Sequence, residues 1–229
     1  MSELKILFED RDIIVCTKPR GVLSQSDEHG GKSMVTLIEE RISADGTKPY
    51  VAVVHRLDTA VGGVMVYAKS KTAAAKLSAC VCDKELFKKQ YIAVICGKPE
   101  EARGVYRDLL FKDTHLSKSF VVDKMRKGVK EASLEYETLG YNEKEDLSLV
   151  KITLHTGRTH QIRVQFSSRK TPLSGDKKYG ARDGRNMLAL WSYSLSFFHP
   201  TSKKPLSFCA LPDENEGIWQ LFDLKELLR

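Results

Sequence analysis

The sequence predicts an α+β fold with a mainly antiparallel mixed central sheet flanked by helices. Two observations lead to this fold class. Apolar, strand-like runs are frequent and are joined by tight turns. Helix-like segments are few and do not alternate regularly with the strands, which argues against a doubly wound parallel sheet. With 229 residues, 41% of them hydrophobic, the chain is long enough to bury a full core.

The first elements are three strands around two turns. Asp12–Thr17 is an apolar run that ends at Lys18–Gly21, whose Pro and Gly indicate a turn. Val51–Val54 and Val64–Ala68 are also apolar, and they flank a short polar turn that carries Asp58. We therefore expect a lone carboxylate on a loop between two strands.

A helix and another strand follow. The segment Lys71–Asp83 is rich in Ala and Lys, and either Ser70 or Thr72 is suited to cap the N-terminus of a helix there. Gln90–Cys96 is strand-like and stops at a Gly.

The second half continues with strand signals and one short helix. Glu131–Leu139 alternates polar and apolar residues, which is typical of a half-exposed strand, and Ser148–Leu154 continues this pattern. Together they predict a hairpin around Tyr141–Asp146. Thr159 is expected to cap a helix that runs through Gln161–Phe166.

The last predicted elements are two strands that follow a basic turn. Gly175–Gly180 is interpreted as a solvated turn, with phosphate contact as the alternative. Met187–Phe198 and Pro205–Ala210 are expected to be strands, separated by His199–Lys204.

Charge and cysteine usage point to a soluble, cytoplasmic protein that binds a polyanion. The formal charge is +7, and Lys151–Arg185 holds nine Lys or Arg against two Asp, which favours nucleic acid over a membrane surface. The N-terminus carries acids where a signal peptide needs an apolar run, and no apolar run is long enough to span a bilayer. The five cysteines form neither a zinc pattern nor a disulfide framework, so no metal is expected.

The turn around Asp58 is the most informative motif. A single acid on a loop beside His55 and Arg56 fits a positioned nucleophile or general base. The alternative is a turn Asp that hydrogen-bonds its own backbone, which is the commoner role of such residues.

Two other groups of residues have a functional and a structural interpretation. Thr156–Arg163 leads through a Gly into a helix N-terminus, where Arg158, His160 and Arg163 would favour a phosphate or a carboxylate. The alternative is a polar helix start with surface arginines. Tyr91 at a strand start is either a core-edge aromatic or a ring that stacks on a base.

Taken together, these blocks resemble the RluA family of RNA pseudouridine synthases. His55-Arg-Leu-Asp58 with the paired glycines that follow is similar to the family's signature motif. The strand that begins at Lys89 and carries Tyr91 is similar to the family's Tyr-bearing strand. The blocks His155–Arg163 and Ser194–Pro200 agree in order and spacing. Where the family usually has Thr-Ser-Gly after the Asp, this chain has Val-Gly-Gly, which leaves the Asp in register.

The resemblance implies an enzyme that isomerises uridine to pseudouridine in structured RNA, either ribosomal or transfer RNA. It implies Asp58, Tyr91 and Arg163 as catalytic residues, with Arg163 paired to Asp58. It implies Arg56, His55, Arg158 and His160 as RNA-binding residues, with Arg56 filling the space of a flipped base. It also implies no cofactor and a monomer. We expect residues 1–229 to form one catalytic domain without a separate N-terminal RNA-binding module.

Two other classes of function stay open on the sequence. The chain would be an inactive RNA-binding protein if catalysis were lost, although the set Asp58, Tyr91 and Arg163 is intact. It would be a hydrolase of phosphoesters if His55 or His160 acted with Asp58, but the sequence lacks a nucleophile elbow or metal motif.

Overall fold

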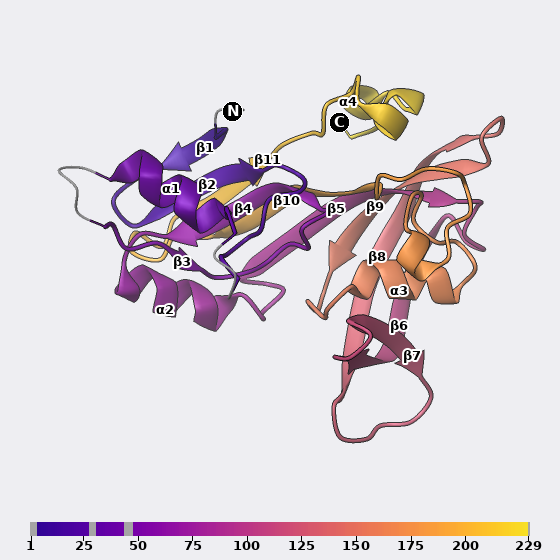
Figure 1. Ribbon diagram of the computed structural model, residues 1–229, viewed down its shortest axis with the longest axis horizontal. Coiled ribbons are helices and arrows are strands. Elements are labelled where there is room, and N and C mark those ends of the chain that lie inside the picture. Colours follow the sequence, from indigo (N-terminus) through magenta and orange to yellow (C-terminus); the bar gives the residue numbers. More distant parts are fainter. Residues whose placement is uncertain (1–3, 28–30, 44–47, 229) are drawn as a thin grey trace. The chain divides into compact units, whose positions relative to one another are not determined.

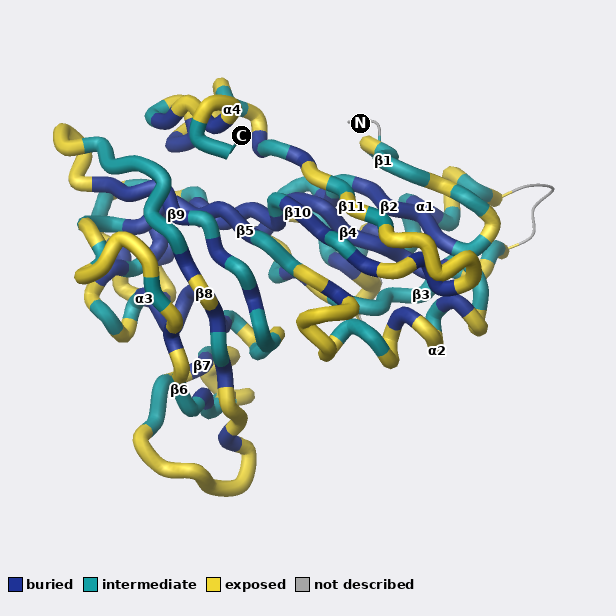
Figure 2. The backbone as a smooth tube through the Cα atoms, turned by 180° about the vertical axis from the view of Figure 1, so that it is seen from behind, coloured by how far each residue is buried: buried dark blue, intermediate teal, exposed yellow. Residues whose placement is uncertain are grey.

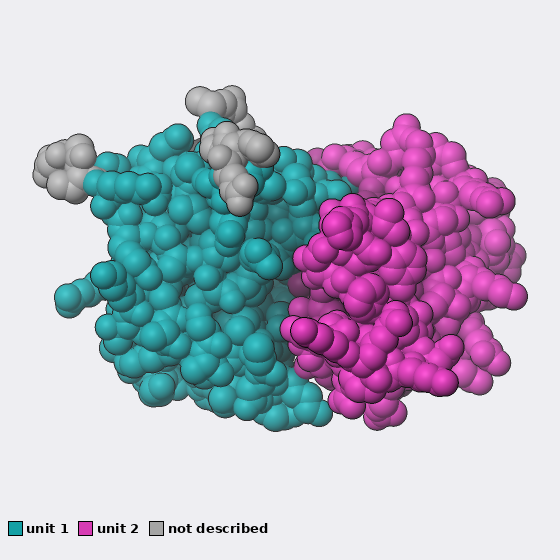
Figure 3. Space-filling view, turned by 60° about the horizontal axis from the view of Figure 1, so that its bottom comes forward, with its two compact units in different colours: residues 1–89, 192–210 teal, residues 90–191, 211–229 magenta. Residues whose placement is uncertain are grey.

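The fold consists of two compact units, which Figure 3 colours separately. The computed structural model describes residues 4–27, 31–43 and 48–228. Unit 1 comprises Met1–Lys89 and Ser192–Ala210, and unit 2 comprises Gln90–Trp191 and Leu211–Arg229. The expected single catalytic domain without a separate N-terminal module stays a prediction.

Unit 1 is a sheet with two helices (Figure 1). The strand order is β1-β2-β4-β10, with β3 also paired to β4 and β11 to β10. The β1–β2, β2–β4, β3–β4 and β10–β11 pairs are antiparallel. The elements of unit 1 are β1 (Ile6–Glu9), β2 (Ile13–Lys18), α1 (Met34–Ile42), β3 (Ala52–Val53), β4 (Gly62–Ala68), α2 (Lys71–Cys80), the start of β5 (Phe87–Cys96), most of β10 (Leu190–Phe198) and β11 (Pro205–Cys209).

The core of unit 1 is centred on β4, whose residues are all buried (Figure 2). A strand that is apolar on both faces needs cover on both, and α2 supplies part of it. Ser70 caps α2 by accepting a hydrogen bond from the Ala73 amide at 3.2 Å, so Ser70 and not Thr72 is the N-cap. Ala73 and Leu77 of α2 pack into a cluster with residues of β2, β4 and β10.

Unit 2 contains a second set of strands, in the order β5-β9-β8-β6-β7, with α3 against β6 and β7 (Figure 1). The β6–β7, β6–β8 and β8–β9 pairs are antiparallel. The elements of unit 2 are the rest of β5, β6 (Arg103–Asp113), β7 (Lys118–Val122), β8 (Val129–Asn142), β9 (Leu147–Leu154), α3 (Gln161–Ser168), η1 (Lys177–Tyr179), η2 (Gly217–Leu221) and α4 (Leu224–Leu227).

Aromatic side chains join α3 to the strands of unit 2. The ring of Phe166 lies edge-on to Tyr106 and Tyr136, with centroids 5.2 and 5.6 Å away. On the same helix, Val164 packs with Leu110 and Ala132. These contacts fix the helix that carries Arg163 to its sheet.

The predicted elements are present with shifted ends, and several were missed. Asp58 lies between β3 and β4, and the hairpin around Tyr141–Asp146 joins β8 to β9, both as expected. The helix predicted over Lys71–Asp83 ends at Cys80. The elements that the sequence did not reveal are β1, α1, β6, β7, the two 3-10 turns and α4. In the part of the chain that is described, no helix is long and apolar enough to cross a membrane.

Candidate active site

Asp58 lies in the connection between β3 and β4 of unit 1. The two strands pair through Ala52 with Ala68 and Val53 with Tyr67, so the chain reverses over residues 54–61. The Asp58 carbonyl accepts a hydrogen bond from the Val61 amide at 2.9 Å, which closes a turn immediately before β4. The side chain of Asp58 thus leaves a tight turn whose two ends are fixed in one sheet.

Lys18, which the sequence pattern assigns only to a turn, anchors this connection. Its side chain is fully buried, and its ammonium donates to the carbonyls of Pro19, Val22 and Thr59 at 3.1, 2.6 and 3.2 Å. Burial lowers the pKa of Lys18 to about 8, while the charge of the Asp58 carboxylate acts in the opposite direction. Lys18 therefore supplies positive charge near Asp58 at neutral pH.

Two further contacts hold the main chain on either side of Asp58. The buried Ser24 hydroxyl accepts from the Leu57 amide at 3.1 Å and donates to the Leu57 carbonyl at 2.9 Å. On the other side, the Gly21 amide donates to the Thr59 carbonyl at 2.8 Å. Main-chain atoms on both sides of Asp58 are thus bound, so its backbone position is over-determined, as an aimed carboxylate requires.

Only glycine fits at Gly63, the second of the paired glycines. Its φ is +123°, and a Cβ there would lie 2.2 Å from the backbone oxygen of Ser192 on β10. The absence of a side chain lets β10 approach β4 closely, and Ser192 then donates from its hydroxyl to the Val64 carbonyl at 3.0 Å.

We expect Gly63→Ala to lower the free energy of unfolding by about 3 kcal/mol, because backbone strain and overpacking act together. Gly21→Ala is the matched control, since Gly21 has φ +80° but nothing within 4 Å of a Cβ. The control should lose about 1 kcal/mol, from strain alone. Urea unfolding of both variants measures the difference, and equal losses would show that the contact with β10 is not decisive.

His55 is engaged with its own sheet. Its Nε2 accepts a hydrogen bond from the Val66 amide at 3.2 Å, and its ring lies edge-on to Phe87 with centroids 5.6 Å apart. Burial, together with the charge of Lys89, lowers the pKa of His55 to about 3. His55 is therefore neutral at physiological pH. The neighbouring Arg56, in contrast, is exposed.

The His55 pKa predicts acid sensitivity. Between pH 6.5 and about 3 the unfolded chain binds a proton at His55 that the folded chain does not. The free energy of unfolding should therefore fall as the pH falls through this window, by up to about 1.4 kcal/mol per pH unit. His55→Gln, which keeps an acceptor for Val66 but does not titrate, should show a shallower dependence in urea unfolding at several pH values. Parallel curves for the two proteins would contradict the assignment.

In unit 2, Arg163 on α3 forms a buried bidentate ion pair with Asp176. Its Nε and Nη2 donate to the two Asp176 oxygens at 2.7 and 2.8 Å, and the Asp176 side chain is 1% exposed. The guanidinium also lies 5.0 Å from the centroid of the Tyr179 ring. This fork-to-carboxylate geometry fixes the plane of the Arg163 guanidinium.

The interpretation of Gly175–Gly180 as a solvated turn is wrong. Asp176 and Tyr179 are buried, whereas Lys177, Lys178 and Gly180 are exposed. The reason is that Asp176 and Tyr179 both bind partners outside this turn. Asp176 neutralises Arg163, and the Tyr179 hydroxyl accepts from the Ser119 amide at 2.8 Å.

The expected cap at Thr159 is also wrong. The N-cap of α3 is His160, in the left-handed region at φ 53°, and it makes no side-chain capping bond. Instead Gln161, the first residue of α3, accepts from the Arg158 amide and the Thr156 hydroxyl at 3.0 and 2.8 Å. The Thr159 carbonyl accepts from the Ser119 hydroxyl, so this residue is bound through its main chain.

The other predicted residues of unit 2 gather at the start of α3 or on β5. Arg158 donates from Nε to the Glu131 carbonyl at 2.8 Å, and His160 Nδ1 lies 2.9 Å from the Tyr179 hydroxyl. Tyr91 is on β5 with 6% of its surface exposed.

The structure thus brings the predicted residues together in two groups. His55, Arg56 and Asp58 share the β3–β4 connection of unit 1, and Arg158, His160 and Arg163 share the start of α3 in unit 2. Sequence reasoning missed Lys18, Ser24 and Asp176. The pairing of Asp58 with Arg163 stays a proposal.

Residues 12–168 match the family described as RNA pseudouridylate synthase, a segment that contains Asp58, Tyr91 and Arg163. The chain belongs to this family. It is therefore related to enzymes that are isomerases of RNA, and the predicted family, enzyme class and fold class are confirmed.

The relatives extend over most of this chain. The dual-specificity RNA pseudouridine synthase RluA of Escherichia coli K12 is 34% identical over 217 residues, which cover 92% of this chain and 94% of the relative. The uncharacterised RNA pseudouridine synthase YhcT of Bacillus subtilis 168 is 34% identical over 202 residues, 87% of this chain and 65% of the relative. This chain thus spans slightly less than two thirds of YhcT.

The fold has a counterpart among solved structures. Human RNA pseudouridylate synthase domain containing 1 matches with a TM-score of 0.74 over 98% of this chain and 94% of that chain, at 22% identity. The similarity at this identity supports the fold alone.

Proposed function

We propose that this chain isomerises uridine to pseudouridine in structured RNA, with Asp58 as the essential carboxylate. The observation that carries the proposal is the fixed position of Asp58, between the Leu57 and Thr59 peptide groups that Ser24, Gly21 and Lys18 hold. A turn Asp with only a structural role needs no such anchors, because its own side chain makes the turn.

The reaction is a rearrangement, so it needs no cofactor. The bond between N1 of uracil and C1′ of the ribose breaks, the base turns, and C5 bonds to C1′. C5 then loses its proton and N1 gains one, so the product is an isomer of the substrate. Asp58 acts on the ribose, either as a nucleophile at C1′ or as a base at C2′.

Either role requires an ionised carboxylate, which nearby cations favour. Lys18 of unit 1 is one such cation, since its ammonium interacts with Asp58. Arg163 is the second, and we propose that it pairs with Asp58 while Asp176 holds its guanidinium plane.

The uridine must leave its stack before the ribose is accessible. We propose that Arg56, which is exposed beside Asp58, fills the vacated space with its guanidinium. Tyr91 packs against the extruded base in this proposal.

The remaining predicted residues act on the RNA backbone. Arg158 and His160 at the start of α3 would contact phosphates, with His55 as a further, neutral contact. The proposed substrates are ribosomal or transfer RNA, and the proposed state is a cytoplasmic monomer with no small-molecule cofactor.

A transcript labelled with tritium at C5 of uridine tests the function. The full chain is incubated with labelled ribosomal and transfer RNA transcripts in the presence of a chelator. Tritium release with intact strands supports the synthase, because C5 loses its proton only in the isomerisation. Strand cleavage would support a hydrolase, and binding without either change would support an inactive RNA-binding protein.

A further inference from the structure

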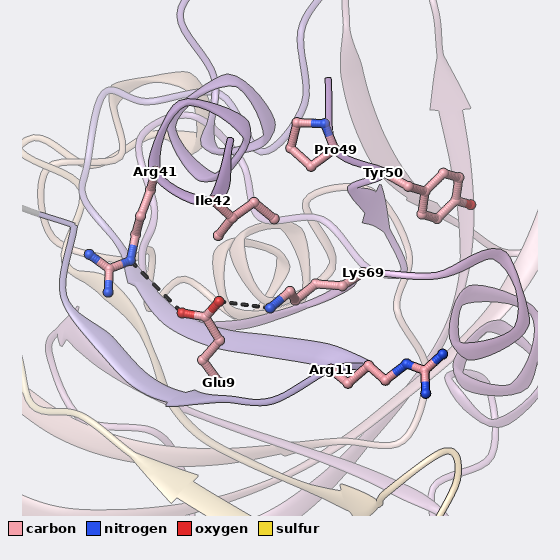
Figure 4. A pocket seen from close by; sticks show the side chains of 7 residues that line it. All are labelled: Glu9, Arg11, Arg41, Ile42, Pro49, Tyr50 and Lys69. Carbon is pink, nitrogen blue, oxygen red and sulfur yellow. Dashed lines mark hydrogen bonds and ion pairs between the residues drawn. The ribbon is translucent and has the colours of Figure 1, made fainter. Parts of the chain in front are cut away.

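Unit 1 contains a hollow of about 500 Å³ that the proposed reaction does not use. Figure 4 shows its wall, which combines cations with an apolar side. The residues that line it are Glu9, Arg11, Arg41, Ile42, Pro49, Tyr50 and Lys69.

The polar side of the hollow is a cationic cluster arranged by one carboxylate. Glu9 lies between Lys69, at 2.7 Å, and Arg41, at 3.9 Å (Figure 4). Lys69 also donates to the Asp10 carbonyl at 2.7 Å, and its side chain is only 18% exposed. Arg11 also lines the hollow, so three cations stand against one carboxylate in its wall, and the hollow attracts anions.

Two polar groups of the hollow point to a ligand. Among the residues that the structure describes, neither the Arg11 guanidinium nor the Tyr50 hydroxyl has a hydrogen bond or an ion pair within the chain. Tyr50 is 40% exposed, which is high for a large aromatic residue that lines a hollow with Ile42 and Pro49. Arg11 and Tyr50 line the same hollow, and a cation together with an exposed ring can bind a nucleotide, with the phosphate on the cation and the base on the ring.

The hollow is separate from the proposed active site. Lys69 directly follows β4, whereas Asp58 precedes it. Seven strand residues span roughly 23 Å at about 3.3 Å per residue. RNA that reaches the hollow therefore lies several nucleotides away from the reacting uridine.

We propose that this hollow binds a backbone phosphate of the RNA outside the target nucleotide, with the adjoining base against Tyr50. The proposal rests on the proposed function, which supplies the RNA. The hollow is open to solvent, as the 46% exposure of the Arg41 side chain shows. An RNA strand can therefore cross the hollow without being enclosed.

The test compares two double variants that each remove two positive charges from unit 1. Arg11→Gln with Arg41→Gln alters the hollow, and Lys71→Gln with Lys76→Gln alters the exposed side of α2. The probe is a fluorescein-labelled oligouridylate of about 20 nucleotides, and anisotropy gives its Kd at several KCl concentrations.

We expect the hollow variant to raise the Kd about fivefold and to reduce the slope of log Kd against log salt by about 0.7, which is one phosphate of a single strand. The α2 variant should stay within about twofold of the wild type. Equal effects of the two double variants, or no effect of either, would overturn the proposal.

Glu9→Gln should change the RNA affinity in the opposite direction to the hollow variant. Removing the carboxylate leaves the cations of the hollow unopposed, so this variant should bind the same RNA more tightly, by about twofold or more. Weaker binding by Glu9→Gln would show that the cluster has only a structural role, and would also overturn the proposal.

A last arm separates RNA phosphate from free phosphate. Replacing chloride with 10 mM inorganic phosphate at matched ionic strength should leave the RNA Kd within about twofold, since a single diester contact is only one part of RNA binding. If inorganic phosphate weakens RNA binding by the wild type but not by the hollow variant, the hollow is a site for free phosphate instead. These measurements need no turnover, whereas tritium release by the wild type tests the proposed function on its own.

Discussion

Replacement of Asp58 by Asn is expected to abolish pseudouridine formation and to leave the fold intact. The amide has the shape of the carboxylate but neither its nucleophilicity nor its basicity, so turnover should fall by at least about a thousandfold. The turn should survive because Lys18, Gly21 and Ser24 bind main-chain atoms of Leu57 and Thr59, which the substitution does not touch. Carbodiimide modification followed by primer extension on a transcript measures the product.

Glu85→Gln is the control for this experiment. It removes one exposed carboxylate from the same unit and should retain full turnover. Thermal unfolding of Asp58→Asn within a few degrees of the wild type would show that its fold is intact. Product formation by a folded Asp58→Asn protein at more than a few per cent of the wild-type rate would rule out an essential carboxylate at this position.

Replacement of Asp176 by Asn should give the second large effect, on both stability and turnover. Asp176 is a buried partner of Arg163, and removing its charge takes a bidentate carboxylate away from an arginine whose side chain is only 11% exposed. Breaking one partner of a buried pair costs about 3 kcal/mol. The guanidinium plane also loses its fixed orientation, so the single-turnover rate should fall at least about tenfold.

Asp108→Asn is a matched control, because Asp108 also pairs with an arginine of the same unit. Its partner Arg169 is 33% exposed and lies 3.0 Å away, with its guanidinium 3.9 Å from the Tyr106 ring. This variant should lose less stability and keep its single-turnover rate within about twofold. If Asp176→Asn kept a normal rate at a temperature where it is folded, Arg163 would not need Asp176 for its role.

The location of Asp58 was predictable, whereas the groups that hold it were not. Two apolar runs that flank a polar turn are visible in the sequence, and both strands form. Lys18 lies 40 positions earlier in a segment that reads as a turn, and nothing local indicates that its ammonium is buried against three carbonyls. The carbonyls of Pro19 and Val22 are local, but that of Thr59 is 41 positions away, so the complete site for the ammonium forms only when the β3–β4 connection is in place.

The errors in unit 2 have a similar cause. Thr159 has the residue type of a cap, but the chain enters α3 through a left-handed His160, and Gln161 binds the Thr156 hydroxyl and the Arg158 amide of the segment that precedes the helix. The turn at Asp176 is basic in composition, and its single acid is buried by an arginine 13 positions away. Strand β6 escaped detection because charged residues interrupt its alternation, although it pairs with strands on both sides.

The anchoring of the Asp58 connection through main-chain atoms makes this loop suitable for labelling. The side chains of Thr59 and Ala60 are exposed, while the Thr59 carbonyl is the atom that Lys18 and Gly21 bind. With the exposed Cys82 and Cys209 replaced by Ser, Thr59→Cys would therefore carry a fluorophore on the turn and leave the carboxylate at position 58 where it is. Such a reporter would detect the arrival of RNA one residue from the proposed chemistry, independently of whether any product forms.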